Sequence, residues 1–315
     1  MWRVDPSQIF IAIVLDLLLG DPRGWPHIAR WAGWLSAAYE KLLTARLRRS
    51  VLLGVVFWIL VAGTMLAIYA AAHRICSALN PLAGRVLETL VIYQAIAAMD
   101  LSRHVKAIIV PLANGNLAAA RSRLAWIVGR DTEALGESEI SRAAIESVAE
   151  STTDAVIAPL FWSFVAGAPG ALLYRTANTL DSMVGHRTVA YEKFGKASAR
   201  IDDVLNWLPA RICAGAFCVF RSAVHWKTIR REAAAHASPN AGWGEAAMAY
   251  AIGVRLGGDN FYDGQCVHGP VFNASGRAAA AADIASSLVW MWRIAGVCAA
   301  VFVALSFALK FFPLT

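Results

Sequence analysis

Three acidic residues at regular spacing mark the first candidate site. Glu146, Glu150 and Asp154 stand four residues apart, and this spacing predicts that they share one face of an α-helix. Like charges so spaced repel each other by about 0.2–0.5 kcal/mol per pair, so we expect a counter-charge, either Mg²⁺ or arginine. A solvated helix face is the simpler alternative. The acids lead directly into an apolar segment, however, which favours a functional role.

A second polar cluster follows that apolar segment. Arg175, Asn178 and Asp181 lie about one helical turn apart. Mg²⁺ prefers carboxylate and amide oxygens together with waters and substrate phosphates, so Asn178 and Asp181 are candidate ligands and Arg175 is a candidate phosphate clamp. A salt bridge between Arg175 and Asp181 at a helix end is the competing interpretation.

Two further cations lie beside or within an apolar run. Arg200 precedes the run 205–220, and Arg211 is embedded in it. A charged side chain in such a segment needs a partner. For Arg211 that partner is either a nearby carboxylate, Asp202 or Asp203, or an anionic group of a substrate.

A glycine-rich stretch late in the chain, Gly253–Gly264, has the character of a loop that brings backbone N–H groups close to an anion. Gly257, Gly258 and Asn260 are its candidate binding residues, and a plain connector is the alternative. The chain has no GxxxxGK[ST] motif, so any nucleotide is bound without a Walker A loop.

The elements that carry these residues are apolar enough to require a membrane. The chain is 58% hydrophobic and only 16% charged. From Val51 to Ala72 it has no charged residue, which is long enough to cross a hydrocarbon core of about 30 Å as a helix. Other apolar segments, mostly helical, lie near residues 8–20, 86–99, 155–174, 204–220 and 284–309. The stretches 100–154 and 221–283 have ordinary charge density and are expected outside the membrane.

The segment 155–174 contains residues that break helices. Pro159 lies early in it, and Gly167-Ala168-Pro169-Gly170 lies near its end. Broken helices occur at membrane depth where the freed backbone groups line a cavity. Because candidate residues lie on both sides of this segment, we expect it to bend back, or the residues to meet inside the membrane.

The net charge of +7 does not indicate a nucleic-acid partner, because the basic residues cluster beside apolar runs. Lys41, Arg46, Arg48 and Arg49 precede the first span, which predicts a cytoplasmic loop. The N-terminal apolar run lacks a small-residue cleavage site and is expected to be retained. The five cysteines form no CxxC pair, and no disulfide framework or metal site built on them is expected.

Long motifs in a fixed order resemble the CobD/CbiB family of cobalamin-biosynthesis membrane proteins, the adenosylcobinamide-phosphate synthases. The resemblance extends from about residue 10 to residue 310. It rests on LDLLLGDPRGWPH, GRDTEALGESEISRAAIESVAESTTDAVIAPLFW, GAPGALLYRTANTLDSMVGHR, YEKFGKASARIDDVLNWLPAR and GVRLGGDNFYDG. The chain departs from the family pattern at Ser151-Thr152-Thr153 and at Asp259, where proline is frequent.

The resemblance implies an ATP- and Mg²⁺-dependent carbon–nitrogen ligase that crosses the inner membrane several times. Its substrates would be (adenosyl)cobyric acid and aminopropanol or aminopropanol O-phosphate, and its product (adenosyl)cobinamide or the corresponding phosphate. Other late cobalamin-pathway membrane enzymes are candidate partners. The fold expected is a single all-α domain over residues 1–315, a polytopic helical bundle with broken or re-entrant segments and extramembrane helical loops.

The residues and this chemistry together suggest roles. Glu146, Glu150, Asp154 and Asp181 are expected to hold Mg²⁺-phosphate, with Glu146, Glu150 and Asp181 as catalytic residues. Arg175, Asn178, Arg200, Arg211, Gly257, Gly258 and Asn260 are expected to bind substrate or phosphate. A Mg²⁺-dependent membrane prenyltransferase and a transporter with a broken-helix site are the competing functions.

Overall fold

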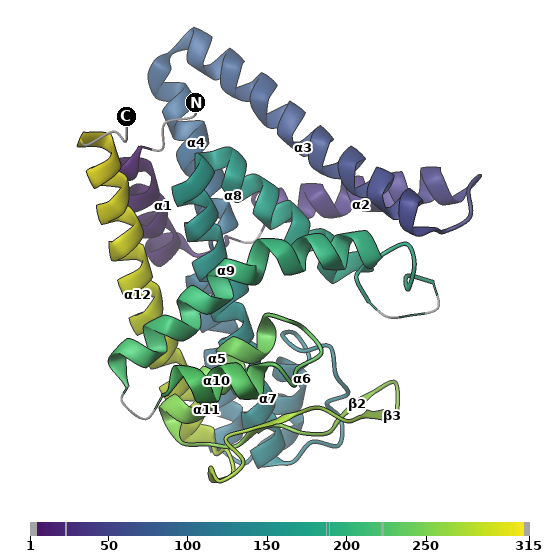
Figure 1. Ribbon diagram of the computed structural model, residues 1–315, viewed down its shortest axis with the longest axis vertical. Coiled ribbons are helices and arrows are strands. Elements are labelled where there is room, and N and C mark those ends of the chain that lie inside the picture. Colours follow the sequence, from purple (N-terminus) through teal and green to yellow (C-terminus); the bar gives the residue numbers. More distant parts are fainter. Residues whose placement is uncertain (1–4, 23, 187, 189, 222–223, 312–315) are drawn as a thin grey trace. The chain divides into compact units, whose positions relative to one another are not determined.

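The computed structural model describes residues 5–311, apart from residues 23, 187, 189, 222 and 223. Within this part of the chain most residues are helical, and the strands are short (Figure 1). Five helical runs are long and apolar enough to cross a membrane: Val51–Leu79, Pro81–Ala113, Glu137–Val184, Lys196–Phe220 and Ala281–Leu309. The predicted all-α, multi-spanning architecture is therefore confirmed.

The helices are α1 (Pro6–Leu19), α2 (Ile28–Thr44), α3 (Val51–Leu79), α4 (Pro81–Ala95), α5 (Ala98–Ala113), α6 (Leu117–Leu124), α7 (Glu137–Ser151), η1 (Thr152–Ile157), α8 (Ala158–Val184), α9 (Lys196–Phe220), α10 (Trp226–Ala233), α11 (Ala241–Ile252) and α12 (Ala281–Phe311). The strands are β1 (Leu256–Gly257), β2 (Asn260–Tyr262), β3 (Gln265–Val267) and β4 (Val271–Phe272).

The chain divides into two compact units, each made of separate stretches of sequence. Unit 1 comprises residues 1–97, 158–206 and 300–315, and unit 2 comprises residues 98–157 and 207–299. Helices α9 and α12 therefore contribute one end to each unit.

In unit 1 a single residue joins two long helices. Ser50 caps α3 at its start by accepting a hydrogen bond from the Leu53 N–H (3.2 Å). Asn80 follows the last residue of α3 and caps α4 by accepting from the Leu82 N–H (2.8 Å). Pro81 then occupies the first helical position, where a missing N–H costs nothing. The result is the sharp turn between α3 and α4 seen in Figure 1.

The apolar core of unit 1 lies against one face of α3. Phe57 and Val61 of α3 pack with Leu180 and Val184 of α8 and with Phe194. Elsewhere α3 leaves large apolar side chains exposed, as at Leu52, Ile59, Ile68 and Ile75. An exposed apolar surface on a helix of this length is what lipid contact requires.

Helix α8 is broken, as the sequence predicts. It is preceded by the π-helix η1, so that Pro159 follows a stretch with i→i+5 hydrogen bonding. Within α8, Ala166 (φ −138°, ψ 16°) and Gly167 (φ 63°, ψ −150°) leave the helical region. The second break falls at the first glycine of the Gly-Ala-Pro-Gly run, because that backbone conformation is open almost only to glycine.

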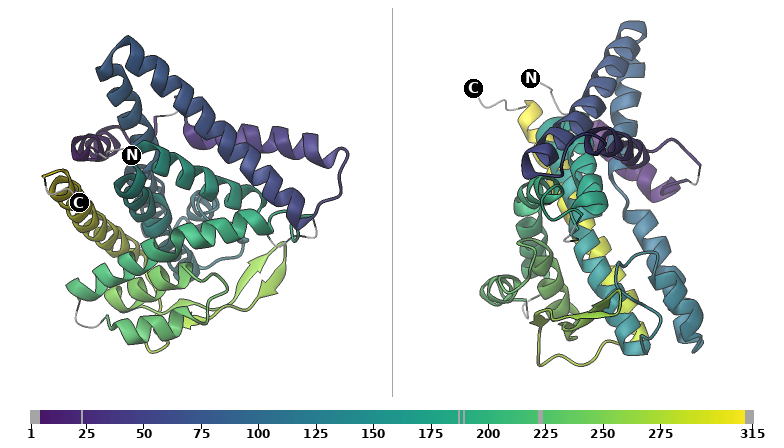
Figure 2. Two further views of the ribbon diagram at one scale, coloured as in Figure 1. Left: turned by 45° about the horizontal axis from the view of Figure 1, so that its top comes forward. Right: turned by 90° about the vertical axis from the view of Figure 1, so that its right-hand side faces the viewer.

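In unit 2, α7 packs against α5, α6, α11 and β1. Strand β1 pairs antiparallel with β4, and β2 pairs antiparallel with β3. The β2–β3 turn places Asp263 (φ 50°) and Gly264 (φ 74°) in the left-handed region, which is characteristic of a two-residue hairpin turn with Asp-Gly. Figure 2 shows β2–β3 as an extended two-stranded ribbon.

The limits of the membrane segments differ from the prediction. The segment expected at 86–99 is two helices, α4 and α5, in one candidate span, and α7 belongs to another. Much of the stretch 100–154 is thus helical and continuous with apolar segments. Charged residues of α5 such as Arg103 and Lys106 are exposed. Hydropathy averaged over consecutive residues does not show whether charged residues lie on one side of a helix and apolar residues on the other.

Candidate active site

Glu146 lies at the centre of a charged network in unit 2. Its side chain is buried, and both carboxylate oxygens accept hydrogen bonds. Oε1 accepts from the Gly257 N–H (2.7 Å) and from Nη1 of Arg142 (3.2 Å), and Oε2 accepts from Nη1 of Arg130 (2.7 Å). Of the two counter-charges considered for this acid, the structure supplies arginine. Glu146 as a metal ligand stays a prediction.

The two arginines also hold the glycine-rich loop. Arg130 and Arg142 both donate to Oδ1 of Asn260, at 2.8 Å and 3.0 Å. Arg142 donates in addition to the carbonyls of Gly257 (2.8 Å) and Asp259 (3.1 Å). Glu146 and Asn260, both predicted site residues, are therefore brought together. The two arginines that join them were missed as site residues, although Arg130 and Arg142 both lie in one of the motifs that carry the family resemblance.

The N–H groups of the glycine-rich loop are engaged inside unit 2. Gly257 donates to Glu146, and Gly258 donates to the carbonyl of Pro270 (2.9 Å). Gly257 (φ 76°) and Gly258 (φ 92°) both need glycine's backbone freedom, and a Cβ at Gly257 would lie 2.0 Å from the Pro270 carbonyl oxygen. A phosphate would have to open one of these bonds, so the predicted backbone contact remains untested.

The predicted stripe of three acids is not a continuous helix face. Glu146 is buried, Glu150 is exposed, and Asp154 lies in the π-helix η1. A π-helix has more residues per turn than an α-helix, so a spacing of eight residues across Ser151 does not return to the same face. The predicted spacing therefore holds for Glu146 and Glu150 within α7, and the expectation of one regular stripe was wrong only for Asp154.

Glu245 on α11 is a buried acid that the sequence reading missed. Burial raises the pKa of its carboxyl well above the usual range, and the carboxylates of Glu146 and Glu150 raise that pKa further. Arg130 and Arg142 act in the opposite direction. The only sequence signal was one acid in an otherwise apolar and small-residue helix.

In unit 1 the polar cluster centres on Asp202 of α9. Asn206 donates from Nδ2 to Oδ2 of Asp202 (3.0 Å), and Asn178 donates from Nδ2 to Oδ1 (3.5 Å). The Tyr174 hydroxyl donates to Oδ1 of Asn206 (2.9 Å). Asp202 and Asn206 are both buried. The predicted candidate Asn178 therefore meets a carboxylate and an amide from a different helix.

Two more carboxylates lie within electrostatic range of this centre. Asp181 of α8 interacts with Asp202 and Asp203 of α9. Arg200 forms an ion pair with Asp203 (3.7 Å), and its side chain is exposed. Arg175 lies on the same helix as Asn178 and Asp181 and is half-buried. The predicted residues Asn178, Asp181 and Arg200 thus belong to one acidic region, whereas Glu146 belongs to unit 2.

Arg211 finds neutral partners within unit 2. Nη1 donates to Oδ1 of Asn240 (2.8 Å) and to the Trp207 carbonyl (2.8 Å), and Nη2 donates to the Pro239 carbonyl (3.1 Å). Its guanidinium also lies over the rings of Trp207 (4.7 Å) and Trp243 (4.8 Å). Carbonyls and indole faces stabilise this cation. The carboxylates Asp202 and Asp203, proposed as its partners from sequence, belong to unit 1.

The residues of both clusters lie in long motifs in a fixed order, and comparison with known proteins shows the family of the chain. A family model described as CobD/Cbib protein matches residues 9–291. The chain belongs to the CobD/CbiB family. The matched range includes every predicted site residue, from Glu146 to Asn260.

Named relatives support the CobD/CbiB assignment over nearly the full length. Cobalamin biosynthesis protein CobD of Klebsiella pneumoniae is 38% identical over 94% of this chain and 96% of its own. CobD of Yersinia enterocolitica is 40% identical over 90% of this chain and 92% of its own. CbiB of Salmonella choleraesuis is 37% identical, with 93% and 95% covered. No solved structure matches this fold.

Membership in the CobD/CbiB family assigns the chain to cobalamin biosynthesis. With its five candidate spans, it is a multi-pass membrane protein of that pathway. The reaction that it performs is a separate question, which depends on what the two polar clusters can bind.

Proposed function

We propose that this protein is an ATP-dependent ligase that joins the carboxylate of (adenosyl)cobyric acid to aminopropanol or its O-phosphate. Such a reaction requires a carboxylate to be activated. A carboxylate is a poor acyl donor, and the simplest activation transfers the γ-phosphoryl group of ATP to it. The amine then attacks the acyl carbon, the C–N bond forms, and phosphate leaves with the C–O electron pair. The ammonium form of the amine loses its protons to water or a base, and ADP and phosphate are the other products.

The observation that carries this proposal is the acid and amide cluster of unit 1. Asp181, Asp202 and Asp203 lie close enough to repel one another, and amide groups of Asn178 and Asn206 contact Asp202. Three acids kept together on two helices of a membrane protein repel one another, and a bound cation would offset that repulsion. Carboxylate and amide oxygens are hard donors, and they fit Mg²⁺ with its retained waters and phosphate ligands.

In this arrangement Asp181 and Asp202 would hold Mg²⁺, and Asp203 would add negative charge beside them. Bound Mg²⁺ would neutralise phosphate oxygens while the phosphoryl group is transferred. Asn206, fixed by Tyr174, keeps the Asp202 carboxylate in one orientation through the bond between Asn206 Nδ2 and Asp202 Oδ2. This network is preorganised, as electrostatic catalysis requires.

Cationic residues of unit 1 are suited to the anionic substrates. Arg200 is exposed, and its ion pair with Asp203 is long at 3.7 Å. An exposed pair of this kind is worth about 0–1 kcal/mol, so Arg200 can turn toward a phosphate or a corrinoid carboxylate at little cost. Arg175 lies one helical turn from Asn178 on α8, and we propose that it also binds a phosphate or a corrinoid carboxylate. No residue is assigned as the general base.

The decisive experiment is an assay with purified protein in detergent. The reaction contains cobyric acid, ATP, Mg²⁺ and either aminopropanol or aminopropanol O-phosphate, and the corrinoid product is measured by mass spectrometry. We expect one product per ADP formed. Comparison of the two amines identifies the true acceptor. Absence of product with both amines, or product without ATP, would overturn the ligase proposal, and detergent removes any gradient that a transporter needs.

Substitutions separate the metal role from folding. Asp181→Asn and Asp202→Asn should each lower the rate on the order of 100-fold at fixed Mg²⁺. They should also raise the Mg²⁺ concentration needed for half-maximal rate. Glu192→Gln, at an exposed acid outside the cluster, is the matched control and should keep wild-type activity. An unchanged Mg²⁺ dependence in both cluster variants would exclude these aspartates as ligands.

A further inference from the structure

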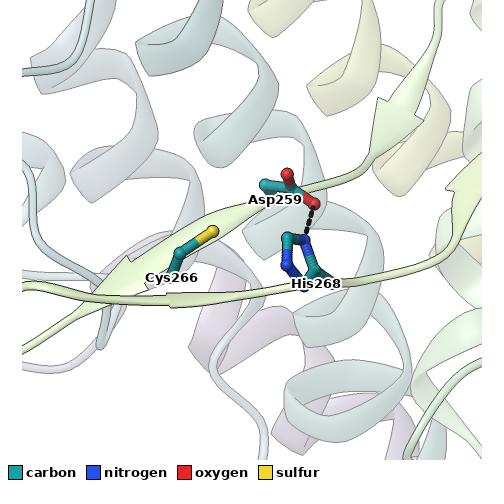
Figure 3. A group of neighbouring side chains, drawn as sticks. All are labelled: Asp259, Cys266 and His268. Atoms are coloured by element: carbon teal, nitrogen blue, oxygen red, sulfur yellow. Dashed lines mark hydrogen bonds and ion pairs between the residues drawn. The ribbon is translucent and has the colours of Figure 1, made fainter.

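Three potential metal ligands of different chemistry meet on the ribbon of unit 2. Asp259 precedes β2, Cys266 lies on β3, and His268 follows β3 (Figure 3). Each offers one ligand atom, and these atoms lie within 4.8 Å of one another. Among the described residues no other group of three or more His, Cys, Asp or Glu side chains meets this criterion. From this geometry we propose that Asp259, Cys266 and His268 form a binding site for Zn²⁺ or a related divalent transition metal.

The register of the ribbon explains why these side chains meet. Successive side chains alternate between the faces of a strand, so Cys266 and His268, two residues apart, share one face. Asn260 pairs with Val267, and the preceding residue on one strand, Asp259, is therefore next to His268 on the other. The Asp259 carboxylate and Nδ1 of His268 are 2.9 Å apart. Cys266 Sγ lies on the same side in Figure 3.

The ribbon is held in place without any metal. The Asp131 carboxylate accepts hydrogen bonds from the N–H groups of Asp263 (3.1 Å) and Gly264 (2.8 Å) at the turn. At the other end, Arg130 and Arg142 bind the Asn260 side chain. A two-stranded ribbon alone is marginal in water. These contacts provide the backbone order that a three-ligand site needs.

The ligand types select the metal. Thiolate sulfur and imidazole nitrogen suit Zn²⁺ and its neighbours in the first transition series, whereas Mg²⁺ and Ca²⁺ prefer oxygen alone. Bonds of about 2.0–2.3 Å in a tetrahedron put ligand atoms roughly 3.3–3.8 Å apart. A separation of at most 4.8 Å closes to this range by side-chain rotation, which exposed side chains permit. Three protein ligands leave the fourth position open to water or another ligand.

An ion pair alone does not account for the arrangement. The Asp259–His268 pair is exposed, with 56% and 81% of the side chains accessible, and a pair so exposed to water contributes little to stability. Nor does that pair involve the thiol. The cysteine spacing carried no metal signature in the sequence, because the site combines one cysteine with a histidine two residues later and an acid across the ribbon.

The test is metal binding by the intact protein in detergent, without substrates. Under reducing conditions, titration with Co²⁺ should give a thiolate-to-cobalt charge-transfer band and the d–d absorption of tetrahedral Co²⁺. Addition of Zn²⁺ should displace the Co²⁺ and abolish both absorptions. Cys266→Ser should remove the charge-transfer band, and both Cys266→Ser and His268→Gln should weaken Zn²⁺ binding about tenfold or more. Since the ligands are exposed, the metal-free variants should unfold at the wild-type temperature.

Matched control variants test whether other cysteines and histidines contribute to the measured Zn²⁺ binding. Cys76→Ser changes a half-buried cysteine, and His104→Gln changes a histidine that also faces an aspartate, Asp100, at 3.3 Å. Both should bind Zn²⁺ as the wild type does. The proposed site would be overturned if the wild-type protein showed no measurable Zn²⁺ binding, or if Cys266→Ser and His268→Gln both bound Zn²⁺ with wild-type affinity. Because no substrate is present, this outcome is independent of the ligase proposal.

Discussion

At the scale of single residues, the burial of Glu146 between two arginines has a measurable consequence. The side chain is 5% exposed, and those of Arg130 and Arg142 are 13% and 15% exposed. Removing one partner from a buried network leaves the others with uncompensated charge, at a cost of about 3–5 kcal/mol. Glu146→Gln keeps the size and removes the charge. We expect it to lower the thermal unfolding temperature of the purified protein clearly.

The control for this prediction is another acid of the same helix. Glu137 is exposed in the first turn of α7, and Glu137→Gln should change the stability by no more than about 0.5 kcal/mol. If both variants unfold at the wild-type temperature, the network contributes nothing to stability. Glu146 would then be free for a different role.

Glu245 predicts a dependence of stability on pH. Its raised pKa means that the folded protein keeps this proton while the unfolded chain releases it near the ordinary value of about 4.3. The unfolded state therefore binds fewer protons over this window, and stability falls as pH rises from that value through the raised pKa. Each unit of pKa difference corresponds to about 1.4 kcal/mol. Glu245→Gln should remove this loss and stabilise the protein at high pH.

Thermal unfolding of wild type and Glu245→Gln between pH 5 and pH 9 would measure this difference. The groups around Glu245 include the imidazole of His236, whose Nε2 lies 3.7 Å from Oε1 of Glu245. His236→Gln is therefore the control, and the effect of Glu245→Gln should persist in that background. Parallel curves for wild type and Glu245→Gln would show that Glu245 ionises normally.

At the scale of elements, the break in α8 depends on one glycine. Gly167 has φ 63° and ψ −150°, a conformation that costs other residues about 1–3 kcal/mol. Gly167→Ala should destabilise unit 1 by that amount or straighten the helix. Gly63→Ala on α3 is the matched control, since a Cβ there meets nothing within 4 Å and alanine favours the helix. Thermal unfolding compares the two, and an equal effect would mean that the kink imposes no constraint.

The elements were predictable where the signal is local. The uncharged run from Val51 identified α3, and Pro159 and Gly167 identified the breaks around α8. The π-helix was not predictable, because its extra residue per turn leaves no mark in residue type. Helix α2 was also missed. It carries both exposed tryptophans and charges, so hydropathy averaged along the chain conceals it.

At the scale of the whole molecule, the candidate site residues were found more readily than their partners. Asn178, Asp181 and Glu146 were identified from the motifs and from their charge or polarity. Placing acids and amides beside apolar membrane segments costs free energy, so such residues are expected to have a function. Their contacts with Asp202 and Arg130 join separate elements of the chain. Such contacts depend on how helices pack, and one sequence without an alignment carries no direct record of packing.

The orientation of the chain in the membrane gives the last prediction. Exposed Arg46 and Arg48 precede α3, so the loop before α3 should be cytoplasmic and the turn at Asn80 should face the opposite side. With Cys76, Cys218 and Cys266 replaced by serine, Leu82→Cys should react with an impermeant maleimide in intact spheroplasts, whereas Leu47→Cys should react only in inside-out vesicles. Neutralising Arg46 and Arg48 with glutamine should weaken this asymmetry if charge sets the orientation. Labelling of Leu47→Cys in spheroplasts would reverse the assignment, because the 29-residue helix α3, long enough to cross the membrane, separates the two positions.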